Sequence, residues 1–127
     1  MSELTVEQHH MLHEYNQLLH TVSEAFEYLE QNIEEEAPTE AQQVFEDLLL
    51  AFEQLSVSHE QMTVLFEEEV EMATLIAGFA EIVDSLKDWF VLETNAQKRE
   101  LLAEKVVPSY EGWKDQVQLF VKPYIAH

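Results

Sequence analysis

The sequence predicts an all-α protein, specifically an antiparallel four-helix bundle of the up-down-up-down type. Only two glycines and three prolines occur in 127 residues, too few for the many tight turns of a small β-protein. Apolar residues recur every three or four positions over long stretches, which is the period of an amphipathic helix. A chain of this length forms a single domain, and short connections between long helices favour antiparallel neighbours.

The first helix is predicted over about residues 4–36, with apolar residues such as Leu12, Leu19 and Phe26 on one face. Pro38 follows, and a proline does not continue a helix easily because it lacks an N–H and its ring clashes with the preceding turn. Three consecutive glutamates at residues 34–36 oppose the helix dipole, so we expect this end to fray.

The second and third helices are predicted over about residues 39–56 and 59–92. Thr39 and Gln42 match the Thr-x-x-Gln capping box that starts a helix. Segment 56–59, which contains two serines, is interpreted as a turn, and Ser58 with Gln61 repeats the capping pattern.

An alternative remains open for this region. The heptad phase of the apolar residues from Val44 to Phe90 stays nearly constant across Ser58 and His59. On that interpretation the second and third helices are one, and three long helices form a dimeric bundle.

The fourth helix is predicted over about residues 95–122, after a further capping pattern at Thr94 and Gln97. Apolar spacing from Leu102 to Tyr124 continues past Pro108. We therefore expect one helix with a kink near Pro108 rather than two helices.

Charge is distributed very unevenly along the chain. The net charge is −20; 20 of the 26 acidic residues and none of the six basic ones precede Lys87, whereas six acids and six bases balance from Lys87 onward. Phosphate contacts need clustered Lys and Arg, so nucleic acids and anionic membranes are not expected partners. A basic partner is attracted instead.

The expected location is cytoplasmic, because the N-terminal residues lack the basic start and apolar run of a secretory signal. No uncharged stretch approaches the length of about 20 apolar residues that crosses a bilayer. The absence of cysteine excludes disulfides, thiolate nucleophiles and cysteine zinc sites.

Three residues are candidate metal ligands. Glu69 shares a seven-residue spacing with Met62 and Ile76, which would place a carboxylate on the apolar stripe of the third helix. Glu7 and His10 form a Glu-x-x-His motif, half of the ligand set of a carboxylate-bridged di-iron bundle, but no second motif completes it. The expectation is therefore no metal, no cofactor and no catalytic residue.

An acidic run at Glu67, Glu68 and Glu71, followed by Glu81 and Asp84, resembles the EExxE and ExxD motifs of all-α nucleoside triphosphate pyrophosphohydrolases. The resemblance implies that these five carboxylates hold magnesium against a triphosphate from two adjacent helices. Nine residues between the motifs leave no room for a hairpin, so a solvated acidic face is expected instead.

The predicted function is a non-enzymatic protein–protein interaction module, such as a small chaperone-like or regulatory protein. Its expected partner is another protein with a basic or amphipathic surface, and the chain itself is expected to be a monomer or a homodimer. Partner-binding candidates are Glu67, Glu68, Glu71 and Leu50, with Leu50 and Leu75 lying off the main apolar stripes. The alternatives are a metal-binding bundle or metal-dependent hydrolase using Glu and His ligands, and an acidic nucleic-acid mimic.

Overall fold

The computed structural model describes residues 4–33 and 38–125. Every regular element in these residues is helical, which confirms the predicted all-α four-helix bundle. Three long helices are followed by a fourth that is built from two α-helical segments with a π-helical turn between them. In chain order the elements are α1 (Val6–Asn32), α2 (Pro38–Leu65), α3 (Val70–Leu86), the 3₁₀ turn η1 (Lys87–Val91), α4 (Asn95–Leu101), the π turn η2 (Leu102–Val106) and α5 (Val107–Ile125).

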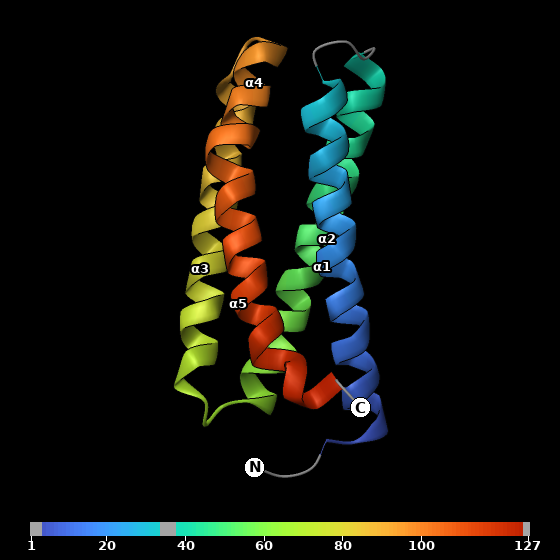
Figure 1. Ribbon diagram of the computed structural model, residues 1–127, viewed down its shortest axis with the longest axis vertical. Helices are drawn as coiled ribbons and strands as arrows, with labels where there is room; N and C mark the ends of the chain where they lie inside the picture. Colours follow the sequence, from blue (N-terminus) through green and yellow to red (C-terminus); the bar gives the residue numbers. More distant parts are fainter. Residues whose placement is uncertain (1–3, 34–37, 126–127) are drawn as a thin grey trace.

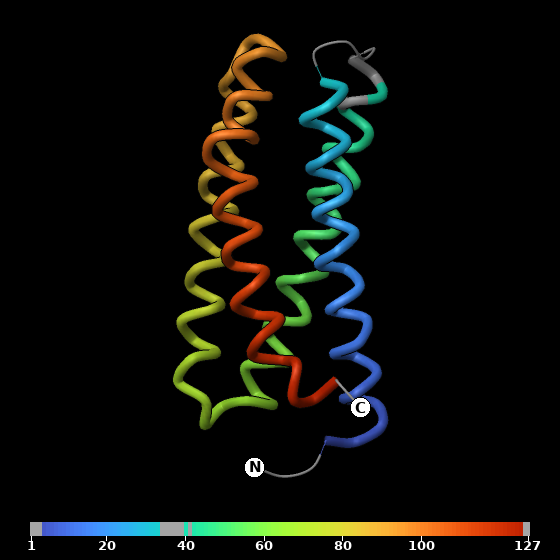
Figure 2. The backbone as a smooth tube through the Cα atoms, in the orientation of Figure 1, coloured from blue at the N-terminus to red at the C-terminus, as the bar shows by residue number. Residues whose placement is uncertain are grey.

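α1 packs most extensively against α2 and next against α5, and α3 packs against α5 (Figure 1). α2 and α3 pack less extensively against each other. Figure 2 follows the chain up α1, down α2, up α3 and down α4 and α5, so consecutive long helices run in opposite directions in this view.

Two helices begin with capping boxes. Thr94 Oγ1 accepts a hydrogen bond from the Gln97 N–H at 3.1 Å, and Gln97 Oε1 accepts one from the Thr94 N–H at 3.2 Å, which confirms the predicted start. Thr5 and Gln8 form an equivalent box that was not predicted, although the same Thr-x-x-Gln signature is present. α2 begins at Pro38. The expected cap at Thr39 and the expected fraying at residues 34–36 lie outside the described residues and side chains.

The predicted break between the second and third helices is in the wrong place. α2 continues through segment 56–59 to Leu65, and the chain turns at residues 66–69 instead. The capping role predicted for Ser58 and Gln61 is therefore wrong. The reason is that the buried stripe of α2 is unbroken across this segment, because His59 takes a position that an apolar residue would normally occupy; its members are Phe45, Leu48, Phe52, Leu55, His59 and Met62.

The turn at residues 66–69 also overturns the alternative of three long helices. Three consecutive glutamates in this turn remain exposed, because burying unpaired carboxylates is costly. Glu69 is the residue before α3 and is exposed, so it does not lie on an apolar stripe. The turn resets the helical phase, and Leu75 is 3% exposed in the core rather than part of a partner patch.

The fourth helix passes Pro108 without ending. Immediately before this proline the backbone adopts the π turn η2, in which the Val107 N–H donates to the carbonyl of Leu102, five residues earlier. A π turn widens the helix where the proline ring would otherwise crowd the preceding carbonyl. The kink expected at Pro108 stays a prediction. The helix continues past Pro123 to Ile125, slightly beyond the predicted end.

Candidate binding surfaces

His59 is a buried histidine in the C-terminal part of α2, with 4% of its surface exposed. Aromatic rings from all three other helices surround it. The ring centroids lie 5.5 Å away for Tyr15 of α1, 4.8 Å for Phe79 of α3 and 5.7 Å for Trp113 of α5. The histidine therefore occupies the point at which the four helices meet.

A hydrogen bond of 2.8 Å joins Tyr15 Oη to His59 Nε2. It is the only hydrogen bond of the Tyr15 hydroxyl to a described residue, and donation from the hydroxyl to Nε2 is the arrangement that leaves no buried hydroxyl proton unpaired. We therefore assign Nε2 as the acceptor and place the ring proton on Nδ1. Burial lowers the pKa of His59 to about 4, so the ring is neutral near pH 7.

A groove of about 400 Å³ runs between α2 and α3 beside this histidine. Ile76, Phe79 and Val83 of α3 give it an apolar wall, and His59 lines it from α2. Asp84 and Lys87 lie at its rim, where Lys87 Nζ is 3.2 Å from Asp84 Oδ1. The groove combines an apolar lining with one buried polar group, a combination typical of ligand sites.

The outward face of α2 carries a second candidate surface, which we call the α2 stripe. It consists of three apolar residues spaced seven positions apart, Leu50, Val57 and Val64. Their exposed fractions are 58%, 53% and 73%, respectively. A parallel acidic row lies one helical turn before each of them and is also exposed; it consists of Glu46, Glu53 and Glu60. Seven residues make about two helical turns, so each set forms a line along the helix.

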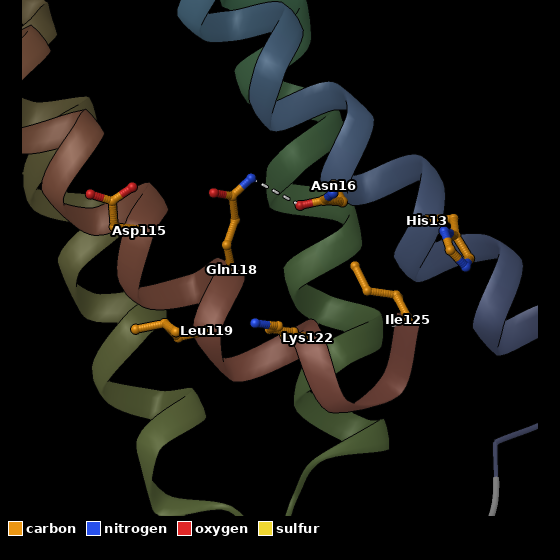
Figure 3. Close-up of a pocket in the computed structure, with 7 residues that line it drawn as sticks. All are labelled: His13, Asn16, Asp115, Gln118, Leu119, Lys122 and Ile125. Carbon is orange, nitrogen blue, oxygen red and sulfur yellow. Dashed lines mark hydrogen bonds between the residues drawn. The ribbon is translucent and has the colours of Figure 1, made fainter. Parts of the chain in front are cut away.

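A trough of about 630 Å³ lies between α1 and α5, with Lys122 and Asp115 among its lining residues (Figure 3). Its side chains are exposed or half-buried, and Gln118 Nε2 donates to Asn16 Oδ1 at 3.0 Å across it. No polar group in its lining is withdrawn from water, so the trough is a weaker candidate than the α2–α3 groove despite its larger volume.

A polar cluster of Ser23, Glu111 and Lys114 links α1 to α5. Ser23 Oγ donates to Glu111 Oε2 at 2.7 Å and accepts from Lys114 Nζ at 2.8 Å, while Lys114 Nζ lies 3.0 Å from Glu111 Oε1. Burial alone would raise the pKa of Glu111, but hydrogen bonds from Ser23 and Lys114 outweigh it and hold the pKa below its usual range. Lys114, only 9% exposed, therefore has its charge compensated.

Comparison with known protein families identifies a family that matches most of the chain. A family model described as a domain of unknown function (DUF8042) matches residues 10–116, which is 107 of the 127 residues. The chain belongs to the DUF8042 family. No curated protein and no solved structure matches it. The DUF8042 match includes all of α2 and α3, and hence both the α2–α3 groove and the α2 stripe. Among the described residues of this DUF8042 chain, no helix is both long enough and apolar enough to span a bilayer.

The metal ligands proposed from the sequence do not assemble in this DUF8042 chain. Glu7, His10 and Glu69 are all exposed, and His10 Nε2 pairs with Glu14 Oε1 of its own helix at 3.1 Å. Within residues 4–33 and 38–125, no three His, Asp or Glu side chains form a group able to hold a metal ion.

The acidic residues proposed for partner binding also lie apart from Leu50. Glu67 and Glu68 are in the turn after α2, and Glu71 is in the first turn of α3; all three are exposed. Leu50 lies about 22 Å along α2 from Leu65, given a rise of about 1.5 Å per residue. The structure therefore separates this set into two regions.

His59 is the residue that sequence reasoning missed. The spacing of three and four residues from Leu55 to His59 to Met62 places it on the buried stripe of α2. A single histidine in phase with apolar residues on both sides was the available signal.

Proposed function

We propose that this DUF8042 chain is a non-enzymatic interaction module that binds a basic amphipathic helix of a partner protein along the α2 stripe. The observation that carries the proposal is the heptad spacing of Leu50, Val57 and Val64 beside a row of glutamates. An apolar line with charged flanks is one half of a two-helix seam, in which flanking charges select the partner.

The apolar line supplies affinity. Each of its residues exposes more than half of its surface in the free bundle. Full burial of a Val or Leu side chain is worth about 1.5–3 kcal/mol, so covering these partly exposed residues contributes about 1 kcal/mol each. A partner helix with apolar residues every three or four positions covers all three at once.

The acidic row supplies selectivity. Glu46, Glu53 and Glu60 favour lysine or arginine on the facing flank of a partner helix, and the net charge of −20 raises the rate of encounter with a basic protein. A second copy is disfavoured on the same ground. It would bring another net charge of −20 and further glutamates to the seam, where like charges repel.

Site-specific photo-crosslinking in the native host tests the proposal directly. A photoreactive amino acid replaces Val57, and the control carries it at Leu119 on α5, which is 70% exposed. We expect crosslinks at position 57 to a partner segment with helical apolar spacing and flanking Lys or Arg. Equal crosslinking at both positions, or crosslinks at position 57 mainly to a second copy, would contradict the proposal.

A designed peptide gives a quantitative test in vitro. The probe is an amphipathic helix with leucines at heptad core positions and lysines at the flanks. Leu50→Asp should weaken its binding at least tenfold, and added salt should weaken it further. Leu119→Asp, which adds the same charge at an exposed leucine on another helix, should leave the affinity within about twofold. Equal losses in the two variants would show that charge alone, not the α2 stripe, holds the peptide.

A further inference from the structure

We propose that the α2–α3 groove is a separate binding site for a small neutral apolar molecule that carries a carbonyl or a similar hydrogen-bond acceptor, held by the Nδ1–H of His59. This site does not depend on the α2 stripe, which lies on the outward face of the same helix.

The proposal starts from Nδ1 of His59, which has no hydrogen-bond partner among the described residues. The other ring nitrogen, Nε2, accepts from Tyr15. Among the described residues, every side-chain nitrogen or oxygen without a hydrogen-bond partner retains some contact with solvent. Nδ1 therefore keeps some contact with solvent although the residue is only 4% exposed, and the α2–α3 groove is the surface cavity that His59 lines. A donor in this position is already desolvated on most sides, so an acceptor that meets it gains a strong hydrogen bond.

The lining decides the remaining chemistry of the ligand. Ile76, Phe79 and Val83 offer apolar surface, and a volume of about 400 Å³ suits a small molecule. At the rim, Lys87 pairs with Asp84, and no described residue forms an ion pair with Glu60. An anionic ligand is repelled by Glu60 and by the net charge of the protein, while a cation finds a donor, not an acceptor, at the floor. A neutral acceptor satisfies both conditions.

The test uses two probes of nearly equal shape, 4-phenylbutan-2-one and butylbenzene, which differ in the carbonyl group. Binding is measured by calorimetry and by the ¹⁵N and ¹H shifts of His59 in histidine-labelled protein. We expect the ketone to bind about five- to tenfold more tightly than the hydrocarbon and to shift the Nδ1–H signal, since a hydrogen bond contributes about 1 kcal/mol. No detectable binding of the ketone, or equal affinities with an unmoved Nδ1–H signal, would overturn the proposal.

Two variants locate the site. Ala80→Trp places an indole in the groove from an exposed position of α3, outside the core, and should abolish binding of both probes. His59→Phe should abolish the preference for the ketone while hydrocarbon binding remains. Gln116→Trp, an exposed substitution on α5, is the control for the added indole. Unchanged binding in Ala80→Trp would place the probes elsewhere and refute the assignment to this groove.

Discussion

Acid should destabilise the folded protein through His59, and the size of the effect follows from its surroundings. Burial lowers the pKa of His59 from 6.5 to about 4. The unfolded chain therefore binds a proton on this ring over a pH range in which the folded protein does not. The contribution of His59 to the free energy of unfolding is fully present above about pH 6.5 and is lost as the pH falls toward about 4. Between pH 7 and pH 5 these two pKa values give a loss of about 2 kcal/mol.

Other ionisable groups lie near His59, and wild type and the His59→Phe variant share all of them. Glu60 is the next residue of the same helix, Asp84 of α3 and Lys87 of η1 line the groove, and Tyr15 faces the ring from α1. Comparing wild type with His59→Phe at each pH cancels the contributions of groups that both proteins share.

Urea unfolding at pH 7 and pH 5 is the assay. His59→Phe leaves the buried Tyr15 hydroxyl without its partner, which lowers stability by about 1–3 kcal/mol at both pH values. The double variant Tyr15→Phe with His59→Phe removes that penalty and should show the same reduced pH dependence. The exposed substitution His13→Gln is the control and should behave as wild type. If wild type and His59→Phe lose equal stability between pH 7 and pH 5, His59 is not a buried neutral histidine in solution.

Three further predictions concern stability. The melting temperature should rise with sodium chloride from low to moderate concentration, because salt screens the self-repulsion of a chain with net charge −20; a falling value in circular dichroism melts would contradict this. Gly112→Ala should stabilise the protein by up to about 1 kcal/mol, since nothing lies within 4 Å of the added Cβ. Gly78→Ala should stabilise the protein less than Gly112→Ala or destabilise it, because the added Cβ would lie 3.2 Å from Trp113 Cδ1. Equal changes in the free energy of unfolding of the two variants, measured by urea unfolding, would refute this packing. Thr94→Ala should lower the free energy of unfolding by about 1 kcal/mol through loss of the capping box, with the exposed helical substitution Thr74→Ala as the smaller control.

The helical fold was predictable because the apolar period persists over many turns and few residues interrupt it. The break between α2 and α3 was not, for a physical reason that His59 illustrates. Neutral, paired with Tyr15 and enclosed by aromatic rings, this histidine packs as a core residue, whereas sequence reasoning counted it as polar. The serines on either side of the apolar stripe then resembled a turn, although Ser56 is simply on the exposed side of a continuous helix.

The candidate surfaces were predictable to a smaller extent. Leu50 lies out of phase with the buried apolar residues of α2, and its exposure follows from that phase alone. Leu75 and Glu69 were misplaced together, because the turn at residues 66–69 shifts the phase of everything that follows it. The α2–α3 groove depends on the distance between the two helices. The apolar periodicity of each helix does not predict that distance.

The hydrogen bonds between α1 and α5 have a consequence for folding during synthesis of the chain. Tyr110 Oη donates to the Leu19 carbonyl across 91 positions of sequence, and the Ser23–Glu111–Lys114 cluster spans a similar separation. At about 5–20 residues per second, a growing chain waits roughly 5–20 s between synthesising α1 and supplying its partner. Until Lys87 is added, the growing chain carries 20 acids and no Lys or Arg, so we expect neighbouring nascent chains to repel one another during most of that interval. We therefore expect the acidic first two thirds of the chain to reduce aggregation between nascent chains before α5 is synthesised.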